Sequence, residues 1–191
     1  YNMPPRSCKQ HPFSPSPVFY RALHIASLFA TIIYTQKGKG HLPMYYSDLV
    51  KKACAIMYDA HKEDVDRGGY PYVLHPFYLA TQMDDEESTC AALLHDVIED
   101  HGDRYSFDDL VRAGFPDSVI HALRLLTHES GVLYMDYVKA LAKDPIARKV
   151  KLADLRHNSD PRRLNGMRAG KYELYQQAIR YLDAENRRTP E

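Results

Sequence analysis

Four titratable side chains lie within six residues of one apolar segment: His95, Asp96, Glu99 and Asp100. The leucine, valine and isoleucine residues around them predict that this segment packs into a core. On a helix, residues three and four apart share a face, so the three carboxylates would lie close together and repel one another. A divalent cation would balance them, because carboxylate and imidazole are both suitable ligands. The alternative is a solvated acidic face with an incidental histidine.

A second segment, residues 150–158, carries an aspartate inside an apolar helix pattern. Asp154 and Asn158 share a face at a spacing of four residues, and Lys151 precedes Asp154 by three. Aspartate is a weak helix former, so its place among valine and leucine needs a reason. That reason is either a surface ion pair with Lys151 or ligation of a metal ion.

His75 stands before a proline, where a lone histidine is usually a helix-start residue. Together with the pair His95 and Asp96, and with Asp154, it supplies two imidazoles and two carboxylates. Borderline and hard divalent cations accept this set of ligands. The sequence therefore predicts a metal site built from three separate helices.

Three linked motifs in this order resemble the HD superfamily of metal-dependent phosphohydrolases. Within it, they resemble the hydrolase domain of the RelA/SpoT family and the small alarmone hydrolases. The resemblance covers roughly residues 49–158. The motifs are Pro71-Tyr72-x-x-His75-Pro76, Ala91-Ala92-Leu93-Leu94-His95-Asp96-Val97-Ile98-Glu99-Asp100, and Lys151-Leu152-Ala153-Asp154 with Asn158.

This resemblance implies a compact all-α, multi-helix HD-domain bundle with the metal site between helices. It also implies hydrolysis of the 3′-pyrophosphate of guanosine tetra- or pentaphosphate, (p)ppGpp. A bound divalent ion lowers the pKa of water, and a nearby carboxylate can accept the proton. The residues expected to hold one Mn²⁺ are His75, His95, Asp96 and Asp154; those expected to activate the water are Glu99 and Asp100; those expected to contact the substrate are Arg67, Lys151 and Asn158.

The segments expected to recognise the base depart from the family pattern. Asp66 stands where an arginine that stacks on guanine is expected, which leaves Arg67 as the cation of that loop. Asp160 and Pro161 replace side chains associated with nucleotide contacts. Guanine specificity therefore stays open, and an alternative is the same chemistry on another nucleotide or phosphorylated metabolite. A module that senses a nucleotide without hydrolysing it is a third possibility, which the water-activating carboxylates argue against.

Composition restricts the other functions. The 191 residues carry 25 lysines and arginines against 25 aspartates and glutamates, so no net field attracts nucleic acid or an anionic membrane. Three scattered cysteines form no C-x-x-C pair, which favours a reducing cytoplasm over secretion. No Walker loop or dinucleotide-binding glycine pattern appears. We expect a cytoplasmic protein with a small-molecule nucleotide substrate, no nucleic-acid or membrane partner, and a possible homo-oligomer.

Residues 1–43 differ in composition from residues 44–191. They combine a proline- and serine-rich start, an apolar run at 18–34 and a basic linker. We expect a disordered or non-native extension, with Met44 as the natural start and a membrane anchor as the alternative. Residues 44–191 are expected to form a stand-alone hydrolase domain. Apolar periodicity predicts helices at 47–60, 75–83, 88–100, 106–114, 116–129, 134–142, 146–158 and 171–183. Ser47 and Asp144 are expected N-caps, and Ser106 with Asp109 resembles a capping box.

Overall fold

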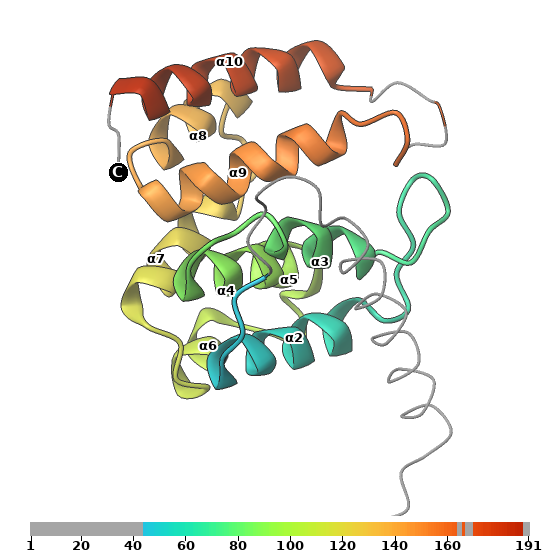
Figure 1. The fold of residues 1–191 in the computed structure, drawn as a ribbon, viewed down its shortest axis with the longest axis vertical. Helices are drawn as coiled ribbons and strands as arrows, with labels where there is room; N and C mark the ends of the chain where they lie inside the picture. Colours follow the sequence, from blue (N-terminus) through green and yellow to red (C-terminus); the bar gives the residue numbers. More distant parts are fainter. Residues whose placement is uncertain (1–43, 164–165, 167–169, 189–191) are drawn as a thin grey trace, which may run out of the picture. The chain divides into compact units, whose positions relative to one another are not determined.

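The computed structural model describes residues 44–163, 166 and 170–188. The predicted extension at 1–43 and its apolar run lie outside these residues. The described part is all-α, as predicted, and its only β-type pairing is an isolated bridge between Val65 and Pro71 (Figure 1). Its helices are α2 (Asp48–His61), α3 (Leu74–Ala80), α4 (Glu86–Leu94), α5 (Val97–His101), α6 (Phe107–Arg112), α7 (Asp117–Leu126), α8 (Tyr134–Leu141), α9 (Pro145–Asn158) and α10 (Tyr172–Arg188).

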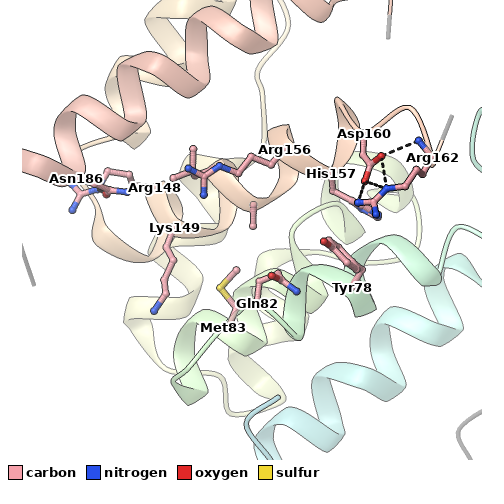
Figure 2. Close-up of a pocket in the computed structure, with 12 residues that line it drawn as sticks. Tyr78, Gln82, Met83, Arg148, Lys149, Arg156, His157, Asp160, Arg162 and Asn186 are labelled. Carbon is pink, nitrogen blue, oxygen red and sulfur yellow. Dashed lines mark hydrogen bonds and ion pairs between the residues drawn. The ribbon is translucent and has the colours of Figure 1, made fainter. Parts of the chain in front are cut away.

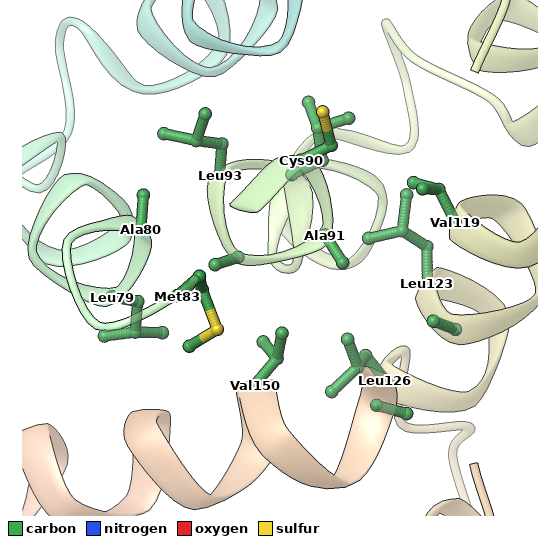
Figure 3. Packing of buried hydrophobic residues seen from close by; sticks show 14 of the residues in the cluster. Leu79, Ala80, Met83, Cys90, Ala91, Leu93, Val119, Leu123, Leu126 and Val150 are labelled. Carbon is green, nitrogen blue, oxygen red and sulfur yellow. The ribbon is translucent and has the colours of Figure 1, made fainter. Parts of the chain in front are cut away.

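Helix α4 lies at the centre of this domain. It packs against α2, α3, α7 and α9, and every residue from Ser88 to Leu94 is buried. Figure 3 shows Cys90, Ala91 and Leu93 of α4 surrounded by apolar side chains of α3, α7 and α9. Residues 90–94 of α4 are all apolar, and such a segment is stable only when other elements cover it completely. Its position is therefore fixed from several directions at once.

Side-chain caps define where several helices begin. Ser47 accepts a hydrogen bond from the Val50 amide at the start of α2, as the sequence predicted. Ser106 and Asp109 form the predicted capping box at the start of α6. The side chains of Asp85 and Asp144 cap α4 and α9 as Ser47 caps α2, by accepting a hydrogen bond from a backbone amide. Each such cap satisfies a backbone N–H that has no partner within its helix.

The predicted continuous helix at 88–100 was wrong, because the structure ends α4 at Leu94 and begins α5 at Val97. Between them, Asp96 has φ −103° and ψ −5°, outside the range of a regular helix. Consecutive residues of a continuous helix do not face one another. The break lets His95 and Asp96 converge, with Nε2 and Oδ2 2.8 Å apart.

Three other helix ends differ from the prediction. Helix α3 ends at Ala80, since the backbone at 81–83 forms tighter i→i+3 turns, although Met83 remains in the core. Helix α7 ends at Leu126, since Thr127 is extended. Helix α10 continues to Arg188 instead of ending at residue 183. None of the helices in the described ranges is long and apolar enough to cross a membrane.

Leu93→Ala should destabilise the domain by about 2–5 kcal/mol, because it leaves a cavity in the middle of a fully buried helix. Leu133→Ala is the matched control, because Leu133 is 73% exposed and should change stability by no more than about 0.5 kcal/mol. Urea denaturation measures both. Equal losses in the two variants would contradict the central place of α4.

Candidate active site

The four predicted metal ligands meet at the junction of three parts of the fold. His75 comes from α3, His95 and Asp96 from the break between α4 and α5, and Asp154 from α9. One ligand atom from each of His75, His95 and Asp96 lies within 4.8 Å of the other two. Asp154 joins them through Oδ1, which lies 3.2 Å from Nε2 of His75. Three of the four side chains are almost completely buried.

His95 shows that this donor set fits a cation. Its Nδ1 lies 2.9 Å from the carbonyl oxygen of Ala92, which can only accept a hydrogen bond, so Nδ1 carries a proton. Its Nε2 is buried and makes no hydrogen bond, although Oδ2 of Asp96 is near. Two ligand atoms this close, one of them a buried nitrogen without a hydrogen-bond partner, suit a shared cation. Although burial lowers the pKa of His95, the Asp96 carboxylate raises it to about 9, so a bound cation would take the place of that proton.

Asp154 is held as a buried carboxylate by three neighbours. Nζ of Lys151 lies 2.9 Å from Oδ2, His75 contacts Oδ1, and the Asn158 amide donates to Oδ1. Burial alone would raise the pKa of Asp154, but Lys151 and His75 together hold it well below its usual range. The predicted pair of Lys151 and Asp154 therefore exists, but it is buried and belongs to the ligand cluster.

Tyr72 is a site residue that the sequence reasoning did not single out. Its hydroxyl donates a hydrogen bond to Oδ2 of Asp96, which orients that carboxylate. The buried ring of His61 packs against Tyr72, with ring centres 4.8 Å apart. Oδ2 of Asp64 satisfies both His61 and His101, at 2.8 Å and 2.7 Å. His61, Asp64 and His101 could together hold a metal ion, but the hydrogen bonds among them already account for their positions. Tyr72 could have been found from its place in the first motif.

Glu99 and Asp100 project from α5 into a cavity of about 380 Å³ that Asp96 and Asp154 also line. Oε2 of Glu99 accepts a hydrogen bond from the backbone amide of His128, at 3.0 Å. Partial burial, followed by repulsion from Asp96 and Glu99, raises the pKa of Asp100 to about 6. A carboxylate with this pKa can accept a proton near neutral pH.

The other walls of this cavity are basic and aromatic. Arg67, Lys151 and Asn158, the predicted substrate contacts, all line it. Arg163 and Lys171 add two further cations. The tyrosines of the wall are Tyr72, Tyr134, Tyr137 and Tyr175. The sequence reasoning missed the last three, which looked like ordinary residues of amphipathic helices. A cavity with this lining suits a phosphorylated, aromatic ligand.

Asp66 stabilises its own loop. Its Oδ1 accepts hydrogen bonds from the amides of Gly68 and Tyr70, at 2.9 Å and 3.0 Å. Its Oδ2 lies 3.4 Å from Nε of Arg163, in a buried ion pair, and Arg163 also donates to Asn158. Gly68 is required here, since an added Cβ would lie 2.5 Å from the carbonyl oxygen of Arg163. The two loops at the rim of the cavity are therefore tied together.

The class of this protein follows from its fold: it is an all-α domain with a His–Asp site between helices. A solved structure of a metazoan orthologue of SpoT, a protein that hydrolyses ppGpp and plays a role in starvation responses, has this fold. The TM-score is 0.55 at 23% sequence identity, over 75% of this chain and 97% of that chain. The predicted fold class is therefore confirmed.

Two curated relatives add a similarity in sequence. The chain is 29% identical over 133 residues to the probable GTP pyrophosphokinase of Mycobacterium leprae, across 63% of this chain and 16% of the relative. It is 27% identical over 131 residues to the guanosine-3′,5′-bis(diphosphate) 3′-pyrophosphohydrolase of Aquifex aeolicus, across 62% of this chain and 18% of the relative. The chain thus spans less than a fifth of the length of these relatives. No protein-family model matches it. The resemblance to the RelA/SpoT family that the motifs indicated is confirmed.

Mn²⁺ should raise the melting temperature of the metal-free protein, because a ligand that binds only the folded state stabilises it, by about 2.7 kcal/mol at one hundred times its Kd. His95→Gln should abolish most of this shift. His121→Gln, a change of an exposed histidine on α7, should leave it intact. Thermal denaturation with and without a chelator measures the shift. A shift of the same size in the His95 variant would show that the ion binds elsewhere.

Asp100→Asn should stabilise the metal-free protein in a pH-dependent way. The pKa of Asp100 in the folded protein, about 6, lies above the value of about 3.9 in an unfolded chain. Its contribution to stability is therefore present at low pH and lost as the pH rises through 6. The melting temperature of the variant minus that of the wild type should increase as pH rises from about 4, and this difference should be constant above about pH 6.

Melting curves at several pH values in a chelating buffer measure this difference. Asp100→Ala serves as the control, because it also removes the charge and should show the same pH dependence. A difference that does not change with pH would contradict a raised pKa at this position.

Proposed function

We propose that this chain is a metal-dependent hydrolase that removes the 3′-pyrophosphate of (p)ppGpp, with Mn²⁺ as the ion. One observation carries the proposal: His75, His95, Asp96 and Asp154 converge beside a cavity that Glu99 and Asp100 enter from the adjoining helix. Both parts of a hydrolytic site, a cation-binding cluster and a proton acceptor, are therefore next to each other. Mn²⁺ and the cytoplasmic location stay predictions.

The residues of the chain would divide the work. The bound ion would supply a water of lowered pKa and neutralise phosphoryl charge. Glu99 and Asp100 would take the proton of the attacking water, and the backbone amide of His128 keeps Glu99 oriented. Arg67 and Lys151 would bind phosphate oxygens. The water oxygen forms the new bond to phosphorus, the bond from phosphorus to the 3′-oxygen breaks and the 3′-oxygen takes up a proton. The products are pyrophosphate and a nucleotide with a free 3′-hydroxyl group.

The names of the relatives support this substrate but not one direction of reaction. One curated relative is named a pyrophosphohydrolase and another a pyrophosphokinase, and each is far longer than the matched region. Hydrolysis is the direction that suits the site, because the described cavity combines a metal-ligand set with carboxylates. A sensor without turnover would need no such carboxylates.

Hydrolysis of another nucleotide or phosphorylated metabolite is the second candidate. It is favoured by Asp66, whose carboxylate is engaged with its own loop and with Arg163. Asp160, a second departure from the family pattern, accepts a hydrogen bond from Arg162 and does not line the catalytic cavity. Neither side chain offers the base a replacement for the contacts that the family pattern provides.

Purified protein with Mn²⁺ should release pyrophosphate from ppGpp. Glu99→Gln should lower the rate by about 10²–10⁴-fold, because the amide cannot accept the proton but can still accept the hydrogen bond from His128. Glu129→Gln is the matched control, since Glu129 is exposed and outside the cavity. Chromatography of the products over time measures both.

A panel of other nucleotides separates the candidates. Release of orthophosphate or pyrophosphate from these nucleotides, with ppGpp left intact, would favour hydrolysis of another substrate. Tight binding of ppGpp with no product, equal in the wild type and in Glu99→Gln, would refute hydrolysis.

A further inference from the structure

His157 makes a direct hydrogen bond to the predicted ligand His75. Their Nδ1 atoms are 2.7 Å apart, and their ring planes differ by only 14°. The ring centres lie 5.0 Å apart. This distance equals the length of the hydrogen bond plus the distance from each ring centre to its own Nδ1, so the two centres and the two Nδ1 atoms lie on one line. The two rings therefore lie edge to edge in nearly the same plane, the geometry of a well-aligned hydrogen bond.

This contact restricts where the protons can be. Of two neutral imidazoles that meet nitrogen to nitrogen, one donates and the other accepts. The Nε2 atom of His75 faces Oδ1 of Asp154, and His75 belongs with His95 and Asp96 to one group of possible metal ligands. For Nε2 to offer a lone pair to a cation, the proton of His75 must be on Nδ1. Nδ1 of His157 must then accept the hydrogen bond that Nδ1–H of His75 donates.

The same arrangement exists at His95 with a different acceptor. There the carbonyl oxygen of Ala92 accepts from Nδ1, so Nε2 is the nitrogen that can offer a lone pair to a cation. At Nδ1 of His75, the side chain of His157 occupies the corresponding position. Hydrogen bonds of this kind orient metal-binding histidines and determine which nitrogen is free.

We propose that His157 is a positioning residue that holds His75 in the form whose Nε2 is free to bind a divalent cation. This inference rests on the cation site of the proposed function. His157 acts through His75 and contacts neither the substrate cavity nor the carboxylates that enter it.

The fold holds His157 from outside the cavity. Tyr78 stacks on its ring, with centres 4.1 Å apart and planes inclined by 20°. Figure 2 shows this pair at one end of a separate groove of about 710 Å³, beside the ion pair of Asp160 and Arg162. The next residue along α9, Asn158, lines the catalytic cavity instead. A change at position 157 therefore leaves the lining of the catalytic cavity intact.

The test compares two variants of almost the same shape. His157→Asn keeps an acceptor, because its side-chain oxygen is attached to Cγ as Nδ1 is in histidine. His157→Leu removes the acceptor. The Mn²⁺ dissociation constant, measured by calorimetry without substrate, should rise by about 10–100-fold in the leucine variant and stay close to the wild-type value in the asparagine variant.

A third variant keeps the test valid if leucine prevents folding. His157→Phe preserves an aromatic ring against Tyr78 and also lacks the acceptor, so it should weaken Mn²⁺ binding to the same degree. Melting curves of the metal-free proteins verify that each variant folds.

Wild-type affinity in the leucine or phenylalanine variant would overturn the proposal. So would an asparagine variant that binds as weakly as leucine, or a wild type that binds no Mn²⁺. A protein whose Mn²⁺ affinity depends on His157 but which leaves ppGpp intact would refute only the proposed function.

Discussion

A buried negative charge at Asp154 imposes the strictest demand on this fold. An unpaired carboxylate inside a protein is costly, and breaking a buried ion pair usually destabilises a protein by several kcal/mol. Helix α9 supplies Lys151 one turn earlier and Asn158 one turn later, and α3 brings His75 to the other side. The carboxylate can remain charged in the core only while these helices keep their places. The requirement for charge balance therefore fixes the packing of α3 against α9.

Helix α4 supplies the second half of the site by a different means. It is covered by four other helices, so its C-terminal end cannot shift without disturbing the core. That end carries His95 and Asp96, and the break before α5 turns both side chains to one point. Sites built on rigid elements hold their ligands more precisely than sites on loops. The end of this buried helix thus positions two of the four predicted metal ligands, His95 and Asp96.

The sequence was informative wherever a local signal matched the tertiary structure. Caps at Ser47 and Asp144 marked helix starts, and apolar periodicity located the helices themselves. The sequence did not reveal the break at Asp96, because the apolar residues on either side of it fit a continuous helix equally well. The last turns of α10 lack an apolar stripe, and there the tertiary hydrogen bond from Arg148 to Asn186 provides a contact that periodicity cannot register. The tyrosines of the cavity were missed for a similar reason: which face of a helix meets a cavity depends on packing.

The ion pair of Asp66 and Arg163 also limits how Asn158 can contribute. Oδ1 of Asn158 accepts from Arg163, and its amide nitrogen donates to Asp154, so the orientation of the amide is fixed at both ends. An asparagine side chain has two N–H groups and two lone pairs. One of each remains for a ligand. Through Arg163, Asp66 therefore restricts the orientation of Asn158, the residue that we expect to place the nucleotide.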